Sequence, residues 1–438
     1  MKQQSTYPPL APLTLTEAVA QGQGIQRTMR LLATSTPQSR NPIRILFYGQ
    51  SITEQSWSKQ VADEIRRRFP HADLTIENRA IGGFASQLLR LPAEHDCYPF
   101  YPDLVIFHVY GGDKEYEEII KNIRSRTTAE VLMQKDHVTQ WPSENPDPAK
   151  DKSLWWDDRM NRETLPKIAQ KYGCALVDVR SGWLSYLKAQ KLEPKALLKD
   201  DVHLNEHGCY VLAQLVLRYL VYRPELKAEA TVRDERPRWK DGTLTLGFTG
   251  NRVDIVGLSG GAMRVLIDGR PPSALALHRI TRPQPNPWSP CALVRVDHAA
   301  PLVEENWTLQ ITGQSGDKKT FTYAVKGSVT GEDGTGSSEK LFVSRSGRVK
   351  ISPEFFFRGF RTDNDIPKGY QITWSVLPLF LDRIVAKTEE TQTIVKTQTI
   401  VQGLKNTGHT LTLLADDPKR PPKLDAIRLY CPPVSELG

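Results

Sequence analysis

Ser51 lies between a predicted strand and a predicted helix, a position that suits a nucleophile. Ser51 follows Gly49 and Gln50, which end the apolar run 43–48, and apolar residues at four-residue steps predict a helix over 56–69. An unbroken apolar run of this kind is typical of a strand covered on both faces of a parallel sheet. The N-terminal amides of the following helix then point back toward the serine. The alternative is an ordinary strand-to-helix turn, because matches as short as Gly-x-Ser recur by chance.

A carboxylate and a histidine near residue 200 can supply the base that such a serine needs. Asp200 and His203 lie three residues apart, just before an apolar helix expected over 209–222. A serine hydroxyl is a weak nucleophile until a base accepts its proton, and a carboxylate that fixes the histidine tautomer improves the base. The alternative is a capped helix start with an exposed histidine. Together the two stretches hold the three groups that this kind of nucleophilic catalysis requires.

These residues resemble the SGNH, or GDSL-like, hydrolase family, whose sequence blocks occur in the right order across residues 43–210. The first block resembles Gly-Gln-Ser-Ile-Thr at 49–53, with glutamine where aspartate is usual, and the last resembles the Asp-x-x-His of 200–203. The resemblance implies a three-layer, flavodoxin-like α/β fold and ester hydrolysis without a metal or other cofactor. It also implies that Ser51 is the nucleophile and His203 the general base, which Asp200 orients.

The two middle blocks concern the oxyanion hole. The second resembles residues 78–83, in which Gly83 matches the glycine whose amide helps to form the hole. The third, expected as Gly-x-Asn-Asp, lines up with Tyr-Gly-Gly-Asp at 110–113, so Gly112 replaces the family's asparagine. We expect the Ser51 and Gly83 amides to hold the oxyanion, with backbone near Gly112 or a neighbouring side chain, for which His137 is favoured, as the third donor. The further candidate contacts to substrate or oxyanion are His137, Gln50 and Asp113.

Strand-like and amphipathic stretches alternate between residues 43 and 222. The expected strands are 43–48, 74–76, 104–110, 130–133 and 175–179. Such alternation predicts a parallel sheet with helices on both faces, whose active site lies at the carboxyl ends of the strands. Ser51, Gly83 and Gly112 all follow such ends, and this agreement is independent of the family resemblance.

Helical patterns vanish after residue 238. The strand candidates that follow are short and are separated by Gly, Asn, Asp and Pro: 244–248, 253–256, 264–267, 308–311, 320–325, 340–343, 349–351, 370–374, 391–395, 398–401 and 410–413. Their spacing predicts an all-β sandwich or jelly roll. Residues 404–411 resemble the closing strands of jelly-roll modules attached to carbohydrate-active enzymes. The expected divisions are an N-terminal strap (1–40), a hydrolase domain (41–225), a linker (226–238) and a β-sandwich domain (239–438).

Two features of the second half have competing interpretations. Residues 331–336 read Gly-Glu-Asp-Gly-Thr-Gly, which suits either a flexible turn or a calcium loop with few carboxylates. Several aromatic side chains can either stack on sugar rings or fill a β-rich core. These are Trp239, Trp288, Trp307, Phe355, Phe356, Phe357 and Trp374.

Composition limits the choice of partners and location. The 58 basic residues are interleaved with 50 acidic ones, so the net charge of +8 does not predict a nucleic-acid partner. The five cysteines are scattered without metal-ligand spacing. No apolar run is long enough to span a membrane, and the chain as written lacks a signal peptide. We expect a soluble, cytoplasmic protein, with secretion or a periplasmic location left open if a signal was removed.

The sequence therefore predicts a serine esterase that removes O-acyl groups, acetyl above all, from a carbohydrate. Two alternatives remain open at this stage. One is a carbohydrate-binding protein whose hydrolase-like half has lost activity, which the residues at 50 and 112 favour. The other is an esterase of lipids or other small esters. The sequence does not determine the oligomeric state.

Overall fold

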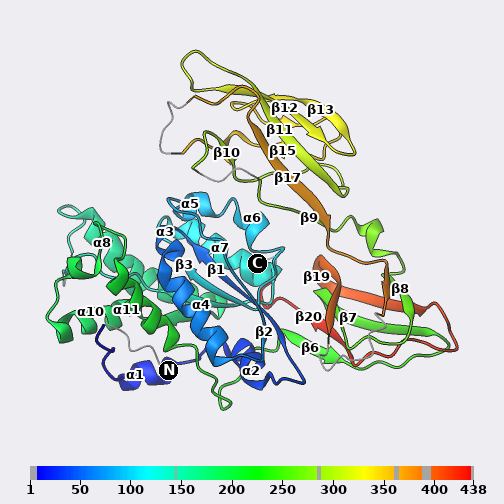
Figure 1. Cartoon of the computed structure of the whole chain (residues 1–438), viewed down its shortest axis with the longest axis horizontal. Coiled ribbons are helices and arrows are strands. Elements are labelled where there is room, and N and C mark those ends of the chain that lie inside the picture. The colour runs from blue at the N-terminus through cyan, green and yellow to red at the C-terminus, as the bar shows by residue number, and fades with distance from the viewer. Residues whose placement is uncertain (1–6, 144–145, 284–287, 360–364, 387–395, 436–438) are drawn as a thin grey trace.

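The computed structural model describes residues 7–143, 146–283, 288–359, 365–386 and 396–435. Figure 1 shows that the chain builds three parts: an α/β unit, an upper lobe that contains β11 and β12, and a lobe on the right that contains β7 and β19. The first part comes from the N-terminal half of the sequence and the other two from the C-terminal half.

A parallel sheet forms the centre of the α/β unit. Its strands are β1 (Pro42–Gly49), β2 (Asp73–Asn78), β3 (Leu104–His108), β4 (Glu130–Gln134) and β5 (Ala175–Val177). They lie in the order β2-β1-β3-β4-β5, and every neighbouring pair is parallel. This is the flavodoxin-like order, so the predicted fold class of this half is confirmed.

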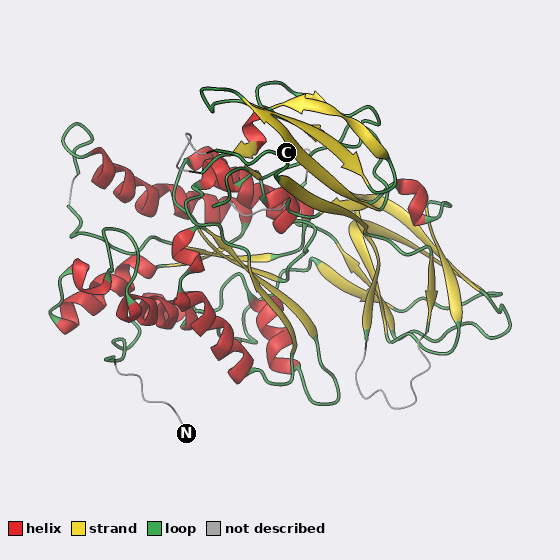
Figure 2. Ribbon diagram, turned by 45° about the horizontal axis from the view of Figure 1, so that its top comes forward, coloured by secondary structure: helices red, strands yellow, loops and turns green. Residues whose placement is uncertain are grey.

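Helices cover both faces of this sheet, as Figure 2 shows. Side chains of β1 alternate between the two faces, because successive residues of a strand point in opposite directions. Ile45 and Phe47 lie in the hydrophobic core that includes α2, α4, α10 and α11, whereas Leu46 and Tyr48 lie in the core that includes α7 and α9. The helices are α2 (Gln26–Thr34), α4 (Ser56–Arg68), α7 (Asp113–Arg126), α9 (Leu165–Tyr172), α10 (Val179–Gln190) and α11 (Glu206–Leu217).

Shorter helices connect these elements. They are α1 (Leu15–Ala20), α3 (Ser51–Glu54), α5 (Ser86–Leu89), α6 (Ala93–Asp96), α8 (Lys152–Arg159), η1 (Met160–Thr164), η2 (Pro194–Leu197), η3 (Pro272–Leu275) and η4 (Pro353–Phe355). None of the helices in the described part of the chain is both long and apolar enough to cross a membrane.

Helix α2 of the N-terminal extension packs at the end of the sheet opposite Ser51. The amides of Arg27 and Thr28, in α2, each donate a hydrogen bond of 2.8 Å to the carboxylate of Glu130, the first residue of β4. Arg27 also pairs with Asp103, just before β3, at 2.8 Å. These contacts lie at the amino ends of β3 and β4, so α2 does not cover the carboxyl ends where the predicted site residues lie.

The second half of the chain is rich in antiparallel sheet, as predicted. One sheet has six strands, in the order β18-β8-β19-β7-β20-β6. They are β6 (Val232–Glu235), β7 (Thr243–Val256), β8 (Ala262–Ile267), β18 (Arg383–Val385), β19 (Thr397–Ala415) and β20 (Ala426–Tyr430). The predicted pairs 244–248 with 253–256, and 398–401 with 410–413, are each one continuous strand. The candidate 391–395 lies outside the described residues.

A second antiparallel sheet has the order β13-β12-β11-β17-β9. Its strands are β9 (His278–Ile280), β11 (Glu305–Gln314), β12 (Phe321–Gly327), β13 (Gly331–Ser337) and β17 (Gln371–Pro378). Two further two-stranded sheets are formed by β10 (Ala292–Leu293) with β16 (Phe356–Phe357) and by β14 (Phe342–Val343) with β15 (Lys350–Ile351). The prediction of a flexible turn or a calcium loop at 331–336 is wrong, because these residues form β13 and pair with β12. Within the predicted linker, β6 pairs with β20.

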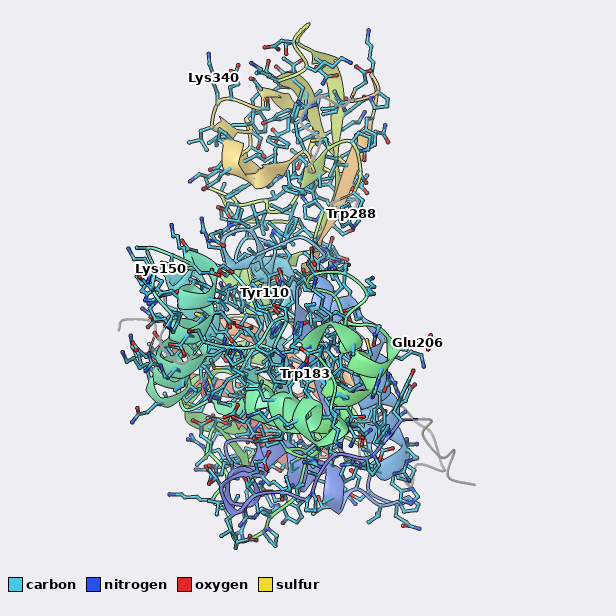
Figure 3. The ribbon with its side chains drawn as sticks, turned by 90° about the vertical axis from the view of Figure 1, so that its left-hand side faces the viewer. Tyr110, Lys150, Trp183, Glu206, Trp288 and Lys340 are labelled. Carbon is cyan, nitrogen blue, oxygen red and sulfur yellow. The ribbon has the colours of Figure 1, made fainter. Side chains whose placement is uncertain are left out.

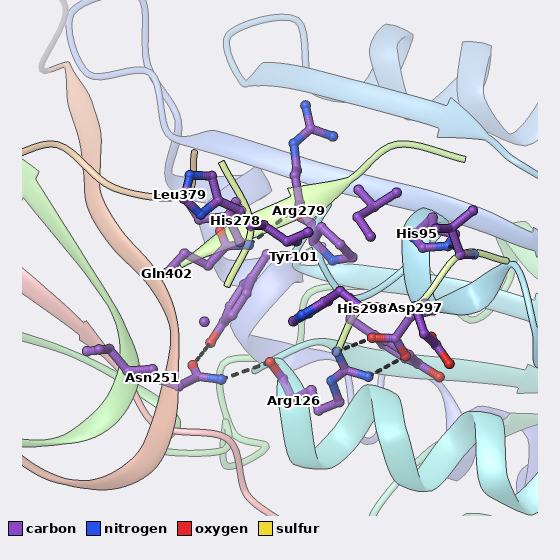
Figure 4. Close-up of a pocket in the computed structure, with 18 of the residues that line it drawn as sticks. His95, Tyr101, Arg126, Asn251, His278, Arg279, Asp297, His298, Leu379 and Gln402 are labelled. Carbon is purple, nitrogen blue, oxygen red and sulfur yellow. Dashed lines mark hydrogen bonds and ion pairs between the residues drawn. The ribbon is translucent and has the colours of Figure 1, made fainter. Parts of the chain in front are cut away.

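The three parts meet around a cavity of about 410 Å³, shown in Figure 4. Several hydrogen bonds around this cavity join one part to another. The Tyr101 hydroxyl donates to the Asn251 side chain at 2.7 Å, and the Asn251 amide donates to the Arg126 carbonyl at 2.9 Å. Nearby, the Val296 amide donates to Nε2 of the buried His95 at 3.1 Å. These bonds fasten the β-rich lobes to the α/β unit.

Candidate active site

Ser51 lies at the turn between β1 and the short helix α3. Glycine is required at position 49, because a Cβ there would lie 2.0 Å from the His108 carbonyl oxygen of the neighbouring strand. The turn is also held from outside: the Asn78 side chain donates to the Thr53 carbonyl at 2.7 Å. The nucleophile candidate therefore sits on a short, fixed helix at the carboxyl edge of the sheet.

The structure brings Ser51, His203 and Asp200 together. Ser51 Oγ lies 2.9 Å from His203 Nε2, and His203 Nδ1 lies 2.9 and 3.1 Å from the two carboxylate oxygens of Asp200. An ionised carboxylate can only accept, so His203 Nδ1 carries the proton and Nε2 is left to accept the serine proton. This is the geometry expected of a serine, its base and the carboxylate that orients the base.

Asp200 is fixed in its ionised form by its own loop. Its Oδ1 accepts the backbone amides of His203 at 2.7 Å and Val202 at 2.9 Å. These hydrogen bonds, that of His203 first, lower the pKa of Asp200 to about 2. The carboxylate is therefore negatively charged at neutral pH.

Two side chains outside this loop hold the residues on either side of His203. Gln55, just after α3, donates from Nε2 to the Leu204 carbonyl at 2.8 Å and accepts the Leu204 amide at 3.0 Å. His137, just after β4, binds the Val202 carbonyl through Nε2 at 3.0 Å. The sequence prediction missed Gln55, and only its position at the start of the helix that follows Ser51 could have suggested it.

His137 does not fit the predicted role of oxyanion donor. A neutral imidazole has a single N–H. In His137 that N–H is donated to the Val202 carbonyl, while Nδ1 faces the Tyr110 hydroxyl at 3.4 Å. Burial lowers the pKa of His137 to about 4, so the ring is neutral at pH 7. Tyr110 and Trp183, both labelled in Figure 3, contact this ring and keep it in place.

A buried polar network fixes the backbone that carries His137. The preceding residue, Asp136, accepts Nε2 of His108 at 2.9 Å and Nδ2 of Asn161 at 2.9 Å through its two carboxylate oxygens. The Asp136 amide in turn donates to Asn161 Oδ1 at 2.7 Å. Because β3, β4 and η1 each contribute one partner, the exit of β4 has little freedom to move.

The residues predicted for the oxyanion hole lie at three neighbouring exits of the sheet. Gly83 has a φ of +78°, a conformation that favours glycine. Gly112 has a φ of −68°, which any residue can adopt, but a Cβ there would lie 2.1 Å from Oε2 of Glu115. Within the described residues, the amides of Ser51 and Gly83 form no backbone hydrogen bond, so both remain available to an oxyanion.

The other two candidate contacts have structural partners. Gln50 is buried, and its carbonyl accepts the amides of Thr53 and Glu54 at the start of α3. Asp113 is the first residue of α7 and pairs with Arg159 at the end of α8. The structure therefore gives both residues a role in holding the local fold.

The comparisons with known proteins agree with this geometry in part. The model of the GDSL-like Lipase/Acylhydrolase family matches residues 47–210, while the comparison with curated proteins gave no match. An acetylxylan esterase from Geobacillus stearothermophilus is 18% identical, with a TM-score of 0.36, over 43% of this chain and 98% of that one. A protein described as a GDSL-like lipase from Parabacteroides merdae is 17% identical, with a TM-score of 0.35, over 42% and 98% of the chains.

Another solved structure with a TM-score of 0.35 is an α/β hydrolase enzyme from the metagenome of Lake Arreo, which is 18% identical and covers 42% of this chain and 98% of its own. Each of the three similar structures covers less than half of this chain. The family match includes the serine and histidine that the structure joins by a hydrogen bond. Residues 47–210 are thus similar to the GDSL-like Lipase/Acylhydrolase family.

Proposed function

We propose that this protein is a serine esterase and that Ser51, His203 and Asp200 form its catalytic triad. The observation that carries this proposal is the unbroken chain of hydrogen bonds from Ser51 Oγ through His203 to Asp200. Each residue meets one requirement of the chemistry: Ser51 is the nucleophile, His203 is the base, and Asp200 is the group that fixes the base.

The reaction proceeds through an acyl-enzyme. Ser51 Oγ attacks the ester carbonyl carbon while His203 Nε2 accepts the serine proton, and the carbonyl oxygen becomes an oxyanion. His203 then gives this proton to the departing alkoxide as the carbon–oxygen bond breaks. A water molecule, deprotonated by His203, attacks the acyl-serine, and the returning proton restores Ser51. The products are an alcohol and a carboxylic acid, and no other reactant is consumed.

The oxyanion is bound by backbone amides in this proposal. The Ser51 amide lies at the start of α3, and the Gly83 amide lies on a turn in which Gly83 has a positive φ. Backbone near Gly112 is the remaining candidate for a third donor, since His137 has no N–H to spare. One such donor is typically worth about 10² to 10³ in rate, so two or three are required for efficient turnover.

The substrate that we propose is an O-acylated carbohydrate, with acetyl as the favoured acyl group. In this proposal residues 41–225 carry out the chemistry, and the β-rich half beyond residue 238 contributes to binding the alcohol part of the ester. The support is that this half is fastened to the α/β unit by hydrogen bonds and a shared hydrophobic core rather than being loosely tethered.

Labelling with a serine-directed phosphonate tests the catalytic assignment. We expect one phosphonate per chain, attached to Ser51, and parallel loss of 4-nitrophenyl acetate hydrolysis. Ser51→Ala should abolish labelling, whereas Ser58→Ala, a serine on the next helix, should not. Absence of labelling in folded wild-type protein would instead favour a carbohydrate-binding protein without esterase activity.

A further inference from the structure

Trp288 is the exception among the aromatic residues that the structure describes in the β-rich half. Trp307, Phe355 and Trp374 are buried, with exposed fractions of 1 to 4%, and so belong to the core. Trp288, between β9 and β10, is 66% exposed. Burial of a tryptophan side chain is normally stabilising, so an exposed fraction this large makes its position on the molecule informative.

Trp288 reaches the α/β unit next to a residue of the candidate oxyanion hole. Its Cζ2 lies 3.4 Å from where a Cβ of Gly82 would be, and Gly82 is the neighbour of Gly83 in the chain. Figure 3 shows the labelled Trp288 where the upper lobe meets the α/β unit. The β-rich half therefore places an exposed indole beside the Ser51 site.

Glu54, the last residue of α3, also contacts Gly82. Its Oε1 accepts the Gly82 amide at 2.8 Å, and its Oε2 lies 2.6 Å from the same Cβ position. Glu54 and Ser51 are three residues apart in α3, so their side chains leave neighbouring positions on that helix. Gly82 has no side chain to fill the space between the indole and this carboxylate.

The combination of an indole and an exposed carboxylate suits a sugar ring. An indole offers a flat apolar face with partial negative charge, against which the C–H groups of a pyranose can pack. A carboxylate accepts hydrogen bonds from neutral hydroxyl groups, and such charge-assisted bonds are stronger than neutral ones. An acyl chain would use the indole but would offer no hydroxyl group to the carboxylate.

We propose that Trp288 and Glu54 form a carbohydrate subsite that holds a sugar ring of the ester beside Ser51. The subsite rests on the proposed esterase function and adds to it a specificity determinant supplied by the β-rich half. It explains why a glycine precedes Gly83 here: any larger residue at position 82 would displace the Glu54 carboxylate or contact the indole.

Kinetics on two classes of ester test the subsite. The substrates are 4-nitrophenyl acetate, which has no sugar ring, and O-acetylated xylo-, manno- and gluco-oligosaccharides. We expect Trp288→Ala to lower the ratio of kcat/KM for the best oligosaccharide to kcat/KM for the aryl ester by about tenfold, the size of one lost aromatic contact. The loss should lie mainly in KM, and Trp288→Phe should recover most of it.

Two further variants sharpen the result. Glu54→Gln keeps an acceptor for the Gly82 amide but removes the charge, so it should lower the same ratio by a few-fold. Leu341→Ala removes another exposed apolar side chain of the β-rich half, 56% exposed, and should leave the ratio unchanged. Circular dichroism and unfolding midpoints verify that each variant is folded.

The outcomes separate the subsite from the esterase assignment. If wild-type protein hydrolyses neither class of ester, the proposed function has failed. If it hydrolyses the aryl ester but none of the oligosaccharides, or if Trp288→Ala leaves the ratio unchanged, the esterase assignment stands and the subsite is wrong. A tenfold fall in the ratio for Trp288→Ala, with Leu341→Ala unaffected, supports it.

Discussion

The two sides of the candidate active site are built in different ways. The Ser51 side is part of the framework: Gly49 ends a buried strand, and α3 begins at once against the neighbouring strand exit. The His203 side is a surface loop, in which the side chains of His203 and Asp200 are 33% and 49% exposed. The nucleophile is thus placed by backbone geometry, whereas the base is placed by side-chain hydrogen bonds.

This difference predicts where the site tolerates change. A turn between packed elements has few alternative conformations, but an exposed loop keeps one conformation only if specific contacts hold it. For the His203 loop those contacts are the two backbone amides on Asp200, and the bonds from Gln55 and His137. We therefore expect substitutions on the Ser51 side to act directly on the chemistry, and those around the loop to act through the position of His203.

The largest effect is expected from the reacting groups themselves. Ser51→Ala and His203→Ala should each lower kcat for 4-nitrophenyl acetate by about 10⁴-fold or more, because neither the nucleophile nor its base has a substitute. The double variant should be no slower than the worse single variant, since the two residues act as one unit. If kcat of the double variant fell by the product of the two single-variant losses, the two residues would act independently and the shared triad would be disproved.

A smaller loss is expected at the orienting carboxylate. Asp200→Asn should lower kcat by about 10² to 10⁴-fold, because the amide neither steadies the charged imidazole nor fixes its tautomer as well. The loss should lie toward the lower end if the exposure of the loop lets water replace part of this stabilisation. A kcat within threefold of wild type would show that His203 does not depend on Asp200.

The contact from Gln55 tests whether side chains position the loop. Gln55→Ala removes two hydrogen bonds to the Leu204 peptide, each worth about 1 kcal/mol, so kcat should fall by about tenfold with little change in KM. Lys59→Ala, an exposed position on the same helix α4, serves as the control and should behave like wild type. Equal activity of the two variants would mean that the His203 loop keeps its conformation without the hydrogen bonds from Gln55.

The smallest effect at neutral pH is expected from the titration of His137, which changes the stability of the fold. Its pKa in the folded protein is about 4, below the ordinary value of 6.5, because burial disfavours the charged ring. Between pH 6.5 and 4 the unfolded chain therefore binds a proton that the folded chain does not, and stability falls as the pH falls. The loss approaches about 3 kcal/mol at pH 4 and vanishes above pH 6.5.

Urea unfolding of wild type and His137→Phe at several pH values measures this contribution. Phenylalanine cannot titrate, so the stability difference between the two proteins should shift in favour of the variant as the pH falls from 6.5 to 4. His95, whose pKa is also lowered to about 4 by burial, stays in both proteins and cancels from the difference. A difference that is independent of pH would show that His137 is not buried in its neutral form.

Sequence periodicity predicted the α/β unit well because its elements have strong, regular patterns. The buried strand before Ser51, the helix after it and the parallel sheet with helices on both faces were all predicted correctly. The same patterns gave β13 as a turn, because three glycines hide the alternation that pairing with β12 imposes. They also divided β7 and β19 into shorter strands, since a shift of register interrupts the apolar alternation without ending the strand.

The sequence by itself determined which residues can do chemistry. Ser51 after a buried strand, and Asp200 three residues before His203, are local patterns, because a turn and an i to i+3 hydrogen bond depend on nearby residues alone. Tertiary structure decided what holds them. His137 became a support for the His203 loop because its single N–H meets the Val202 carbonyl, a contact across 65 residues.

The same holds for the contacts between the two halves of the chain. Trp288 lies beside Gly82 only because the upper lobe folds back onto the α/β unit, and no local pattern encodes a contact over such a separation in sequence. Short-range hydrogen bonding and periodicity can be read from neighbouring residues. Which exposed side chain reaches the active site depends on how separately formed sheets pack, and that is settled only when the whole chain is folded.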